Sequence, residues 1–566
     1  MKFKITHEHI KINSRTQIDS VETLNQLVVA KNQTVSFQII MDTKMLSIIN
    51  TSNEMALTSD IDVSRFRVKV TSLYPTQLFN EMTLQDADGM RYADIISHKP
   101  YVKASADMVH AVWVDIHVLT NCEEISNVNV EIFMAKSIND EQKVFESKIE
   151  LKVLNVELPV PSEYKIYLDL WQHNASIARY FEVPLWSDLH FNIIEKSVKL
   201  LSFLGQKSIM IIGSETPWNG WGSHLMSKDG TALYEHSIIQ LVKLKDGCLK
   251  ADFSIMQRYI DLCSKYGINK DISLYGLVGV WNLPLYPSRK IENYPETLLI
   301  RYYDESSACY KFIKTSEDVI EYLKLVINYF KDTNQLDKVR IAADEPKQEE
   351  YKIKQYYESI SILKEIEPTI RFKVAIDKDG VMDEFKDTVS DICSSFPCTT
   401  RYHKKLGNNI RKLWYVCNIP DKPNTFLNSS LIEARVLGSL TYVFNYDGLL
   451  RWSFTCWTKN PRENIQYATQ GFPVGDLNLV YPEENGDIAI SLRYKALQRG
   501  IEDYEIIRCL IDQGKKEVVD RALSMIRLDL NTSEYMISKR QTKENLFSDD
   551  YKDYEKMRFV LLKGLE

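Results

Sequence analysis

The chain has 566 residues, of which 44% are hydrophobic and 26% are charged, and its formal net charge is −7. This length exceeds the roughly 250 to 300 residues that one hydrophobic core serves, so we expect several domains. The small negative charge gives no reason to expect a nucleic-acid partner, and no apolar run approaches the roughly 18 residues that span a bilayer. The composition is that of an ordinary globular protein.

The first residues, MKFKITHEHIKINSRTQ, contain no apolar stretch of the kind that directs export. The nine cysteines are scattered and without CxxC spacing, which is typical of reduced thiols. We therefore expect a cytoplasmic protein, with nonclassical release as the alternative. His7, Glu8 and His9 alternate in this segment, and we interpret them as part of an exposed strand. No metal and no cofactor is predicted.

Residues 1–160 contain short runs rich in β-branched residues, among them TVSFQIIM, HAVWVDIHVL and KIELKVLNVEL. Such runs, separated by polar turns, predict an antiparallel β-sandwich. The segment LPVPSEY follows them, with prolines at positions 159 and 161. Because proline cannot donate to a strand ladder, this segment predicts a domain boundary near residue 160.

Residues 161–475 alternate short apolar strands with stretches of helical periodicity, such as SEDVIEYLKLVINYFKDT. The eight predicted strands are residues 165–171, 207–213, 271–277, 339–345, 371–377, 398–403, 412–418 and 448–454. Strands that alternate with crossover helices in this way predict a (β/α)8 TIM-like barrel.

Residues 476–566 begin with the hairpin pattern LNLVYPEENGDIAISL, whose turn contains Asn485 and Gly486. Helical patterns follow from about Arg493 to the end. We expect this C-terminal hairpin and helical region to pack on the barrel.

The carboxyl ends of the barrel strands hold a set of polar and aromatic residues. Active sites of such barrels lie at these ends, and acids among aromatic rings are typical of a carbohydrate site. For each aromatic ring, packing in the barrel wall is the alternative role. The substrate-binding candidates, chosen by position, are Asp169, Trp171, His173, Trp218, Tyr402, Trp414, Tyr415, Arg451 and Trp452.

The run VRIAADEP ends an apolar strand on two adjacent acids, Asp344 and Glu345. Neighbouring side chains of a regular strand point to opposite faces, so the two acids can share a pocket only if the pleat is broken there. We expect Pro346 to hold Glu345 extended and to end the ladder, so that a local twist turns both acids inward. The alternative is that Asp344 caps the following helix, with an acidic first turn.

Adjacent acids suit one class of glycosidase mechanism better than the other. An ordinary retaining enzyme separates its acid and its nucleophile across the scissile bond, usually on different strands. A substrate-assisted enzyme uses the 2-acetamido oxygen of the sugar as nucleophile, so it needs one acid for the leaving group and one beside the acetamido group. The sequence therefore favours Asp344 and Glu345 as a catalytic pair of the second kind.

Four segments together resemble glycoside hydrolase family 123: YLDLWQHN at 167–174, ADEP at 343–346, GLLRWSFTCW at 448–457 and SLRYKALQRGIEDYEII at 491–507. Within that family the chain is similar to clostridial β-N-acetylgalactosaminidases that act on glycosphingolipid glycans. The resemblance implies a β-sandwich followed by a catalytic barrel, and release of terminal β-linked GalNAc with retention. It also implies that Asp344 orients the acetamido group and that Glu345 is the general acid and then the general base.

Two other functions stay open from the residues alone. One is a β-N-acetylglucosaminidase or dual β-hexosaminidase, which differs in how the pocket contacts O4 of the sugar. The other is a glycan-binding protein without turnover. In each case the expected partner is an oligosaccharide or the glycan of a glycolipid.

Overall fold

The structure is a computed structural model. It describes residues 1–52, 63–137, 140–217, 234–278, 298–346, 348–462, 473–528 and 535–566. All nine cysteines lie in these ranges and are free thiols. Among the helices of these ranges, none is long and apolar enough to cross a membrane.

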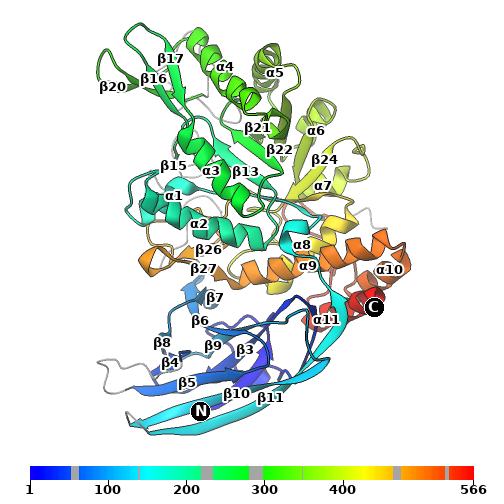
Figure 1. Cartoon of the computed structure of the whole chain (residues 1–566). Coiled ribbons are helices and arrows are strands. Elements are labelled where there is room, and N and C mark those ends of the chain that lie inside the picture. The colour runs from blue at the N-terminus through cyan, green and yellow to red at the C-terminus, as the bar shows by residue number, and fades with distance from the viewer. Residues whose placement is uncertain are drawn as a thin grey trace.

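The N-terminal part is a sandwich of two sheets (Figure 1). Sheet A has the order β1-β3-β9-β6-β7-β27-β26, and sheet B has the order β2-β11-β10-β5-β4-β8. The strands of sheet A are β1 (Lys2–His7), β3 (Thr34–Asp42), β6 (Thr76–Gln85), β7 (Arg91–Ser97), β9 (His110–His117), β26 (Val480–Pro482) and β27 (Ile488–Ser491). Those of sheet B are β2 (Gln26–Lys31), β4 (Ser47–Asn50), β5 (Ser64–Thr71), β8 (Tyr101–Ala104), β10 (Ile125–Ser137) and β11 (Asp140–Glu157).

Sheet A is antiparallel at every pair of these strands, whereas sheet B contains two parallel pairs, β2 with β11 and β4 with β5. Strand β3 is buried on both faces. Phe37 and Ile39 pack against sheet B, and Ile40 packs in the larger core that continues into the barrel. This two-sided burial explains why TVSFQIIM is almost continuously apolar.

The C-terminal hairpin is part of sheet A. Strand β27 pairs antiparallel with β7, where Ile490 lies opposite Ile96, and β26 follows at the edge. We expected this hairpin to belong to a region packed on the barrel; its hydrogen bonds also complete a sheet that begins at residue 2.

Eight parallel strands form sheet C, in the order β12-β25-β24-β23-β22-β21-β18-β13. They are β12 (Tyr167–Leu170), β13 (Ser208–Ile212), β18 (Asp271–Tyr275), β21 (Val339–Asp344), β22 (Arg371–Ile376), β23 (Asp391–Ser395), β24 (Arg411–Tyr415) and β25 (Gly448–Arg451). The two end strands meet at a single bridge between Leu168 and Gln206. The Lys207 amide donates to the Leu168 carbonyl at 3.1 Å, so the sheet closes nearly completely into a TIM-like barrel.

The sixth strand differs from its prediction. Residues 398–403 were expected to form it, but they lie in and directly after helix α7 (Phe396–Tyr402), and the strand is β23. Pro397 stands in the first turn of α7, where its missing N–H has no cost. The β-branched residues Thr399 and Thr400 have strand propensity, which explains the wrong prediction. In the structure Thr399 is helical, and its hydroxyl donates a hydrogen bond to the Ser394 carbonyl.

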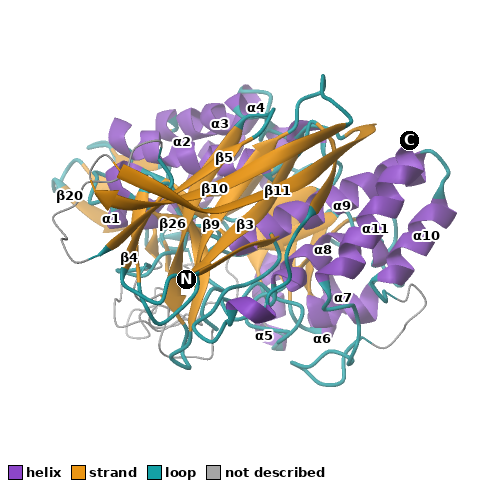
Figure 2. Cartoon of the chain, turned by 90° about the horizontal axis from the view of Figure 1, so that it is seen from below, coloured by secondary structure: helices purple, strands orange, loops and turns teal. Residues whose placement is uncertain are grey.

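Helices lie between successive strands of the barrel: α1 (Asn174–Tyr180), α2 (Asp188–Phe203), α3 (Ser254–Lys265), α4 (Ser316–Asp332), α5 (Glu350–Ile366), α6 (Asp379–Phe385), α7 and α8 (Leu431–Val443). After the hairpin come α9 (Leu492–Asp512), α10 (Lys516–Met525) and α11 (Tyr551–Leu565). Figure 1 shows α9 running between the sandwich and the barrel, and Figure 2 shows α8, α9, α10 and α11 gathered on one side of the molecule. Helix α9 contacts β7 of the sandwich, and α11 contacts β11.

Two small sheets decorate the barrel. One is β14 (Thr216–Pro217) with β15 (Tyr234–Glu235). The other has the order β17-β16-β19-β20, from β16 (Gln240–Lys243), β17 (Leu249–Asp252), β19 (Arg301–Asp304) and β20 (Cys309–Phe312). Strands β14 to β17 lie in the connection after β13, and β19 and β20 lie in the connection after β18, so both small sheets are built from segments that connect barrel strands.

Charged side chains fill the interior of the barrel. Arg340 Nε donates to Asp391 Oδ2 at 3.0 Å, and its Nη2 lies 3.1 Å from Asp271 Oδ1. One level nearer the carboxyl ends, Lys373 forms a buried ion pair with Asp169. Buried charges require such partners because desolvation penalises an isolated ion. These ion pairs lie inside the barrel, below the carboxyl ends of the strands.

Candidate active site

Asp344 is the last residue of β21, opposite Ala375 of β22. The Glu345 amide still donates to the Ala375 carbonyl at 3.0 Å, but Glu345 has φ of +41°, in the left-handed region. A non-glycine residue there is uncommon, and such residues cluster at active sites. The pleat is therefore broken at Glu345. We expected Pro346 to keep Glu345 extended, and that expectation is wrong.

The alternative role of Asp344 as a helix cap is also wrong. Helix α5 begins at Glu350, and its N-cap residue is Glu349. Several residues separate Asp344 from that helix, so a capping role does not explain the two acids.

Tyr415 ends β24 and reaches the second acid. Its hydroxyl donates to Glu345 Oε1 at 2.5 Å. Burial, and then the charge of Glu345, raise the pKa of Tyr415 well above its usual range, so this phenol stays a donor. A charge-assisted hydrogen bond of this kind holds the carboxylate of Glu345 in one orientation.

Both acids lie near one buried thiol, that of Cys393 on β23. Burial raises the pKa of Cys393, and although Lys373 opposes the shift, the charges of Asp344 and Glu345 add to it. Cys393 is fully buried beside Ala375 in the sheet. The charges of both carboxylates therefore act on one thiol of the neighbouring strand β23.

The end of β12 brings Asp169 and Trp171 to the barrel. Asp169 pairs with Lys373, and the Trp171 indole N–H donates to Asp169 Oδ2 at 3.4 Å. The Trp171 ring lies 5.6 Å from that of Tyr275, at the end of β18. These contacts join the ends of strands that are separated in the sequence by about 100 residues.

His173, Arg451 and Trp452 form a second group near β25. The rings of His173 and Trp452 meet edge to face at 6.0 Å. The Trp452 indole N–H donates to Asp476 Oδ2 at 3.2 Å, and Arg451 Nη2 donates to the Asp476 carbonyl at 2.5 Å. Burial, and then Arg179, lower the pKa of His173 to about 3, so its imidazole is neutral.

Two other candidates are held elsewhere, and one falls outside the described ranges. Tyr402 lies in α7, and its hydroxyl donates to Asp383 Oδ2 at 2.9 Å. Trp414 alternates with Tyr415 on β24, packs against Phe444, and donates its indole N–H to Thr441 Oγ1 at 2.9 Å. The structure does not bring these two to the acid pair. Trp218 lies outside the described residues.

Sequence reasoning missed Cys393, Asp476 and Tyr275. Cys393 was missed because the sixth strand was placed too late, although the run DICSS directly before α7 was the available signal. Asp476 follows the barrel strands in a segment without periodicity. Nothing in its neighbours indicates that it holds Arg451 and Trp452.

A family model described as "Glycoside hydrolase 123, catalytic domain" matches residues 171–510. This chain belongs to glycoside hydrolase family 123. The match covers the barrel from the end of its first strand and continues through the hairpin into α9. The family assignment that the four sequence segments indicated is thus confirmed.

Among solved structures, the family 123 glycoside hydrolase from Clostridium perfringens, described as hydrolysing glycolipid glycans, is similar over 100% of this chain and 97% of its own. The TM-score is 0.72 and the identity is 17%, so the likeness shows a shared fold. A β-D-glucuronidase from Dictyoglomus thermophilum matches with a TM-score of 0.30 and 11% identity over 80% of this chain and 68% of its own. A comparison with curated protein sequences finds no match.

Proposed function

We propose that this glycoside hydrolase is an exo-acting, retaining β-N-acetylgalactosaminidase whose catalytic domain is a (β/α)8 barrel. Its substrate is an oligosaccharide or glycolipid glycan that ends in β-linked GalNAc. The observation that carries the proposal is the adjacency of Asp344 and Glu345 at the carboxyl end of β21, with the chain turned at Glu345 by its positive φ. Family membership and the glycolipid glycans hydrolysed by the clostridial enzyme support the substrate class.

The two acids have separate tasks in this mechanism. The acetamido oxygen attacks the anomeric carbon as the bond to the leaving oxygen breaks, and Glu345 donates its proton to that oxygen. Asp344 accepts the acetamido N–H and stabilises the positive charge of the oxazolinium ion that forms. Glu345 then takes a proton from the water that attacks the anomeric carbon. This attack opens the oxazolinium ring and releases the sugar with retention of the anomeric configuration.

Tyr415 serves Glu345 as a positioning residue. Its hydrogen bond to Oε1 leaves Oε2 as the oxygen that exchanges a proton with the leaving group and with water. A carboxyl group fixed in this way needs less reorganisation when the proton moves.

The decisive experiment compares aryl β-GalNAc with aryl β-galactoside. The mechanism requires the acetamido nucleophile, so the first is hydrolysed and the second is not. A series of N-fluoroacetyl analogues sharpens the test, because each added fluorine weakens the nucleophile and lowers kcat. Comparable rates on the GalNAc and galactose substrates would overturn the substrate-assisted mechanism.

A parallel assay with aryl β-GlcNAc separates the proposed specificity from a β-N-acetylglucosaminidase or a dual hexosaminidase. The two sugars differ only at C4, so equal kcat/KM values would replace the proposed enzyme by a dual hexosaminidase. Glycan binding without release of sugar would instead favour a binding protein that has kept the barrel.

A further inference from the structure

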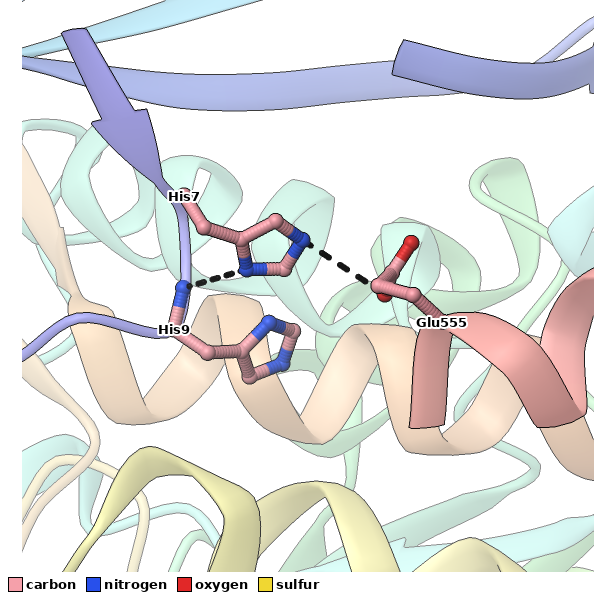
Figure 3. A group of neighbouring side chains, drawn as sticks. All are labelled: His7, His9 and Glu555. Atoms are coloured by element: carbon pink, nitrogen blue, oxygen red, sulfur yellow. Dashed lines mark hydrogen bonds and ion pairs between the residues drawn. The ribbon is translucent and has the colours of Figure 1, made fainter. Parts of the chain in front are cut away.

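The end of β1 and the helix α11 bring three metal-ligating side chains together from opposite ends of the chain (Figure 3). One ligand atom from each of His7, His9 and Glu555 lies within 4.8 Å of the other two. His7 Nε2 is 3.5 Å from Glu555 Oε1. The sequence was interpreted as an exposed strand here, but His7 and His9 are only 4% and 6% exposed, so that interpretation is wrong.

His9 is the unusual member of this group. Both of its ring nitrogens are buried and make no hydrogen bond with any described residue. The nearest carboxylate, Glu8 Oε1, is 3.8 Å from Nδ1, which is too long for one. A buried imidazole without a partner is costly, and native structures usually explain such a group by a bound water or ion.

Metal ions bind the neutral form of histidine. The neutral ring keeps a nitrogen lone pair free for coordination, whereas an imidazolium has none.

The surrounding ion-pair network lacks one positive charge. It links four carboxylates to three guanidinium groups, namely Glu8, Glu502, Asp503 and Glu555 with Arg435, Arg499 and Arg558. The guanidinium groups therefore leave one carboxylate charge uncompensated beside the two histidines. A bound cation would supply the missing charge in a region where an uncompensated ion is expensive.

The supporting contacts and the access are suitable for an ion. Arg435 Nη1 donates to Glu555 Oε1 at 2.7 Å, which orients the carboxylate, and Tyr551 stacks on the His7 ring at 4.4 Å between centroids. A cavity of about 420 Å³ is lined by His7, Tyr551 and Glu555. It offers space for a water ligand and a route for the ion.

We propose that His7, His9 and Glu555 bind one divalent transition-metal ion of the zinc class, with water as a fourth ligand. Two imidazoles and one carboxylate are a ligand set that such ions prefer, whereas calcium and magnesium prefer oxygen ligands. The ion ties the first strand of the sandwich to the last helix of the chain. This role is independent of the glycosidase reaction.

Binding of the ion requires a change at each histidine. His7 Nδ1 accepts the His9 amide N–H at 3.2 Å, which places the ring proton on Nε2, facing Glu555. Coordination through Nε2 moves that proton to Nδ1 and gives up the amide contact, while the proton count of the ring is unchanged. The His9 ring turns toward the ion at the same time.

The test uses the full chain after removal of any histidine tag, stripped with a chelator and dialysed into metal-free buffer. Titration with Zn²⁺ in a calorimeter is expected to give one ion per chain with micromolar or tighter affinity. Thermal unfolding with Zn²⁺ at about 100 times Kd is expected to raise Tm by about 2–4 °C.

Variants locate the ion. His9→Gln and Glu555→Gln are each expected to weaken Zn²⁺ binding by more than about 100-fold, because loss of a supporting contact alone costs 10- to 100-fold. Two matched controls keep binding: His117→Gln, an exposed histidine of the same domain, and His98→Gln, which disrupts a second group of His98, Glu483 and Asp487.

X-ray absorption of the wild-type zinc complex keeps the proposal testable if the variants fold poorly. It is expected to show two imidazole ligands with Zn–N distances of about 2.0–2.1 Å. The proposal is overturned if micromolar Zn²⁺ does not bind, if the bound ion shows fewer than two imidazoles, or if His98→Gln removes the ion and His9→Gln does not.

Discussion

The interior of the sandwich and the interior of the barrel differ in the side chains that fill them. Between the two sheets of the sandwich the core is apolar, and side chains such as Phe37, Phe66 and Ile132 are fully buried there. Inside the barrel, Arg340 and Lys373 lie among carboxylates and are almost fully buried as well.

The difference follows from what each interior must do. Apolar burial stabilises at about 25 cal/mol per Å² and needs no fixed partner, so the sandwich core tolerates small changes of shape. Buried ion pairs add little net stability, but each partner fixes the position of the other. The barrel interior supports the strand ends that hold Asp344, Glu345 and Tyr415, and at the proposed active site a displacement of about 1 Å is expected to lower the rate of catalysis.

Substitution of the acid pair gives the largest expected effect. Glu345→Gln is expected to lower kcat by about 10²–10⁴-fold on natural glycans and by less on substrates with good leaving groups, because those groups need no proton. Asp344→Asn is expected to lower kcat on both kinds of substrate, since the role proposed for Asp344 is to hold the acetamido group. Steady-state kinetics on a glycan and on a dinitrophenyl glycoside measure both. A double variant with normal turnover would eliminate this site.

Lys373→Met removes an ion pair from the barrel interior and leaves the sandwich core unchanged. It leaves Asp169 buried and without its ion-pair partner, so we expect about 3–5 kcal/mol of destabilisation. Guanidinium unfolding measures the change. The double variant Lys373→Met/Asp169→Leu is the control, and it is expected to recover most of the loss because it removes both charges. No recovery would mean that the ion pair is not the cause.

Glu81 on β6 is a buried acid in sheet A. Neither carboxylate oxygen has a hydrogen-bond partner among the residues that the structure describes. Burial, followed by the charge of Asp94, raises the pKa of Glu81 to about 8. The folded protein therefore binds this proton more tightly than the unfolded chain, and stability falls as pH rises from about 4.5 to 8.

The contribution of Glu81 to this fall is about 3 kcal/mol between pH 5 and 7.5. Glu81→Gln is expected to remove that part of the pH dependence and to be the more stable protein at pH 8. Urea unfolding of both proteins at several pH values measures it. Equal slopes for the two proteins would contradict the assignment of a raised pKa to Glu81.

Ile132→Val gives the smallest expected effect. It removes one methylene from the sandwich core and is expected to cost about 0.5–1.5 kcal/mol of stability. kcat on aryl β-GalNAc is expected to stay unchanged, because no charged or catalytic group is displaced. A lower kcat for the fully folded variant would show that a change in the sandwich core affects the barrel.

The sequence alone predicted the elements that depend on local pattern. The apolar run VRIAAD forms β21, as predicted. The alternation of such runs with helical periodicity predicted the barrel, because strands buried on both faces are apolar whichever strands they pair with. The prediction of the sixth strand was wrong because it relied on the strand propensity of Thr399 and Thr400. Pro397 begins a helix there, and β23, which precedes that helix, pairs with β22 and β24 instead.

The acids at the end of β21 were visible in the sequence, and their arrangement was not. Pro346 favours an extended Glu345, yet the tertiary structure holds that residue at φ of +41° and brings Tyr415 to it from β24. Pairing of β27 with β7 and the burial of His7 and His9 against α11 are equally invisible to local pattern. Residues far apart in the chain make these contacts, and only packing of the whole chain decides which of them meet.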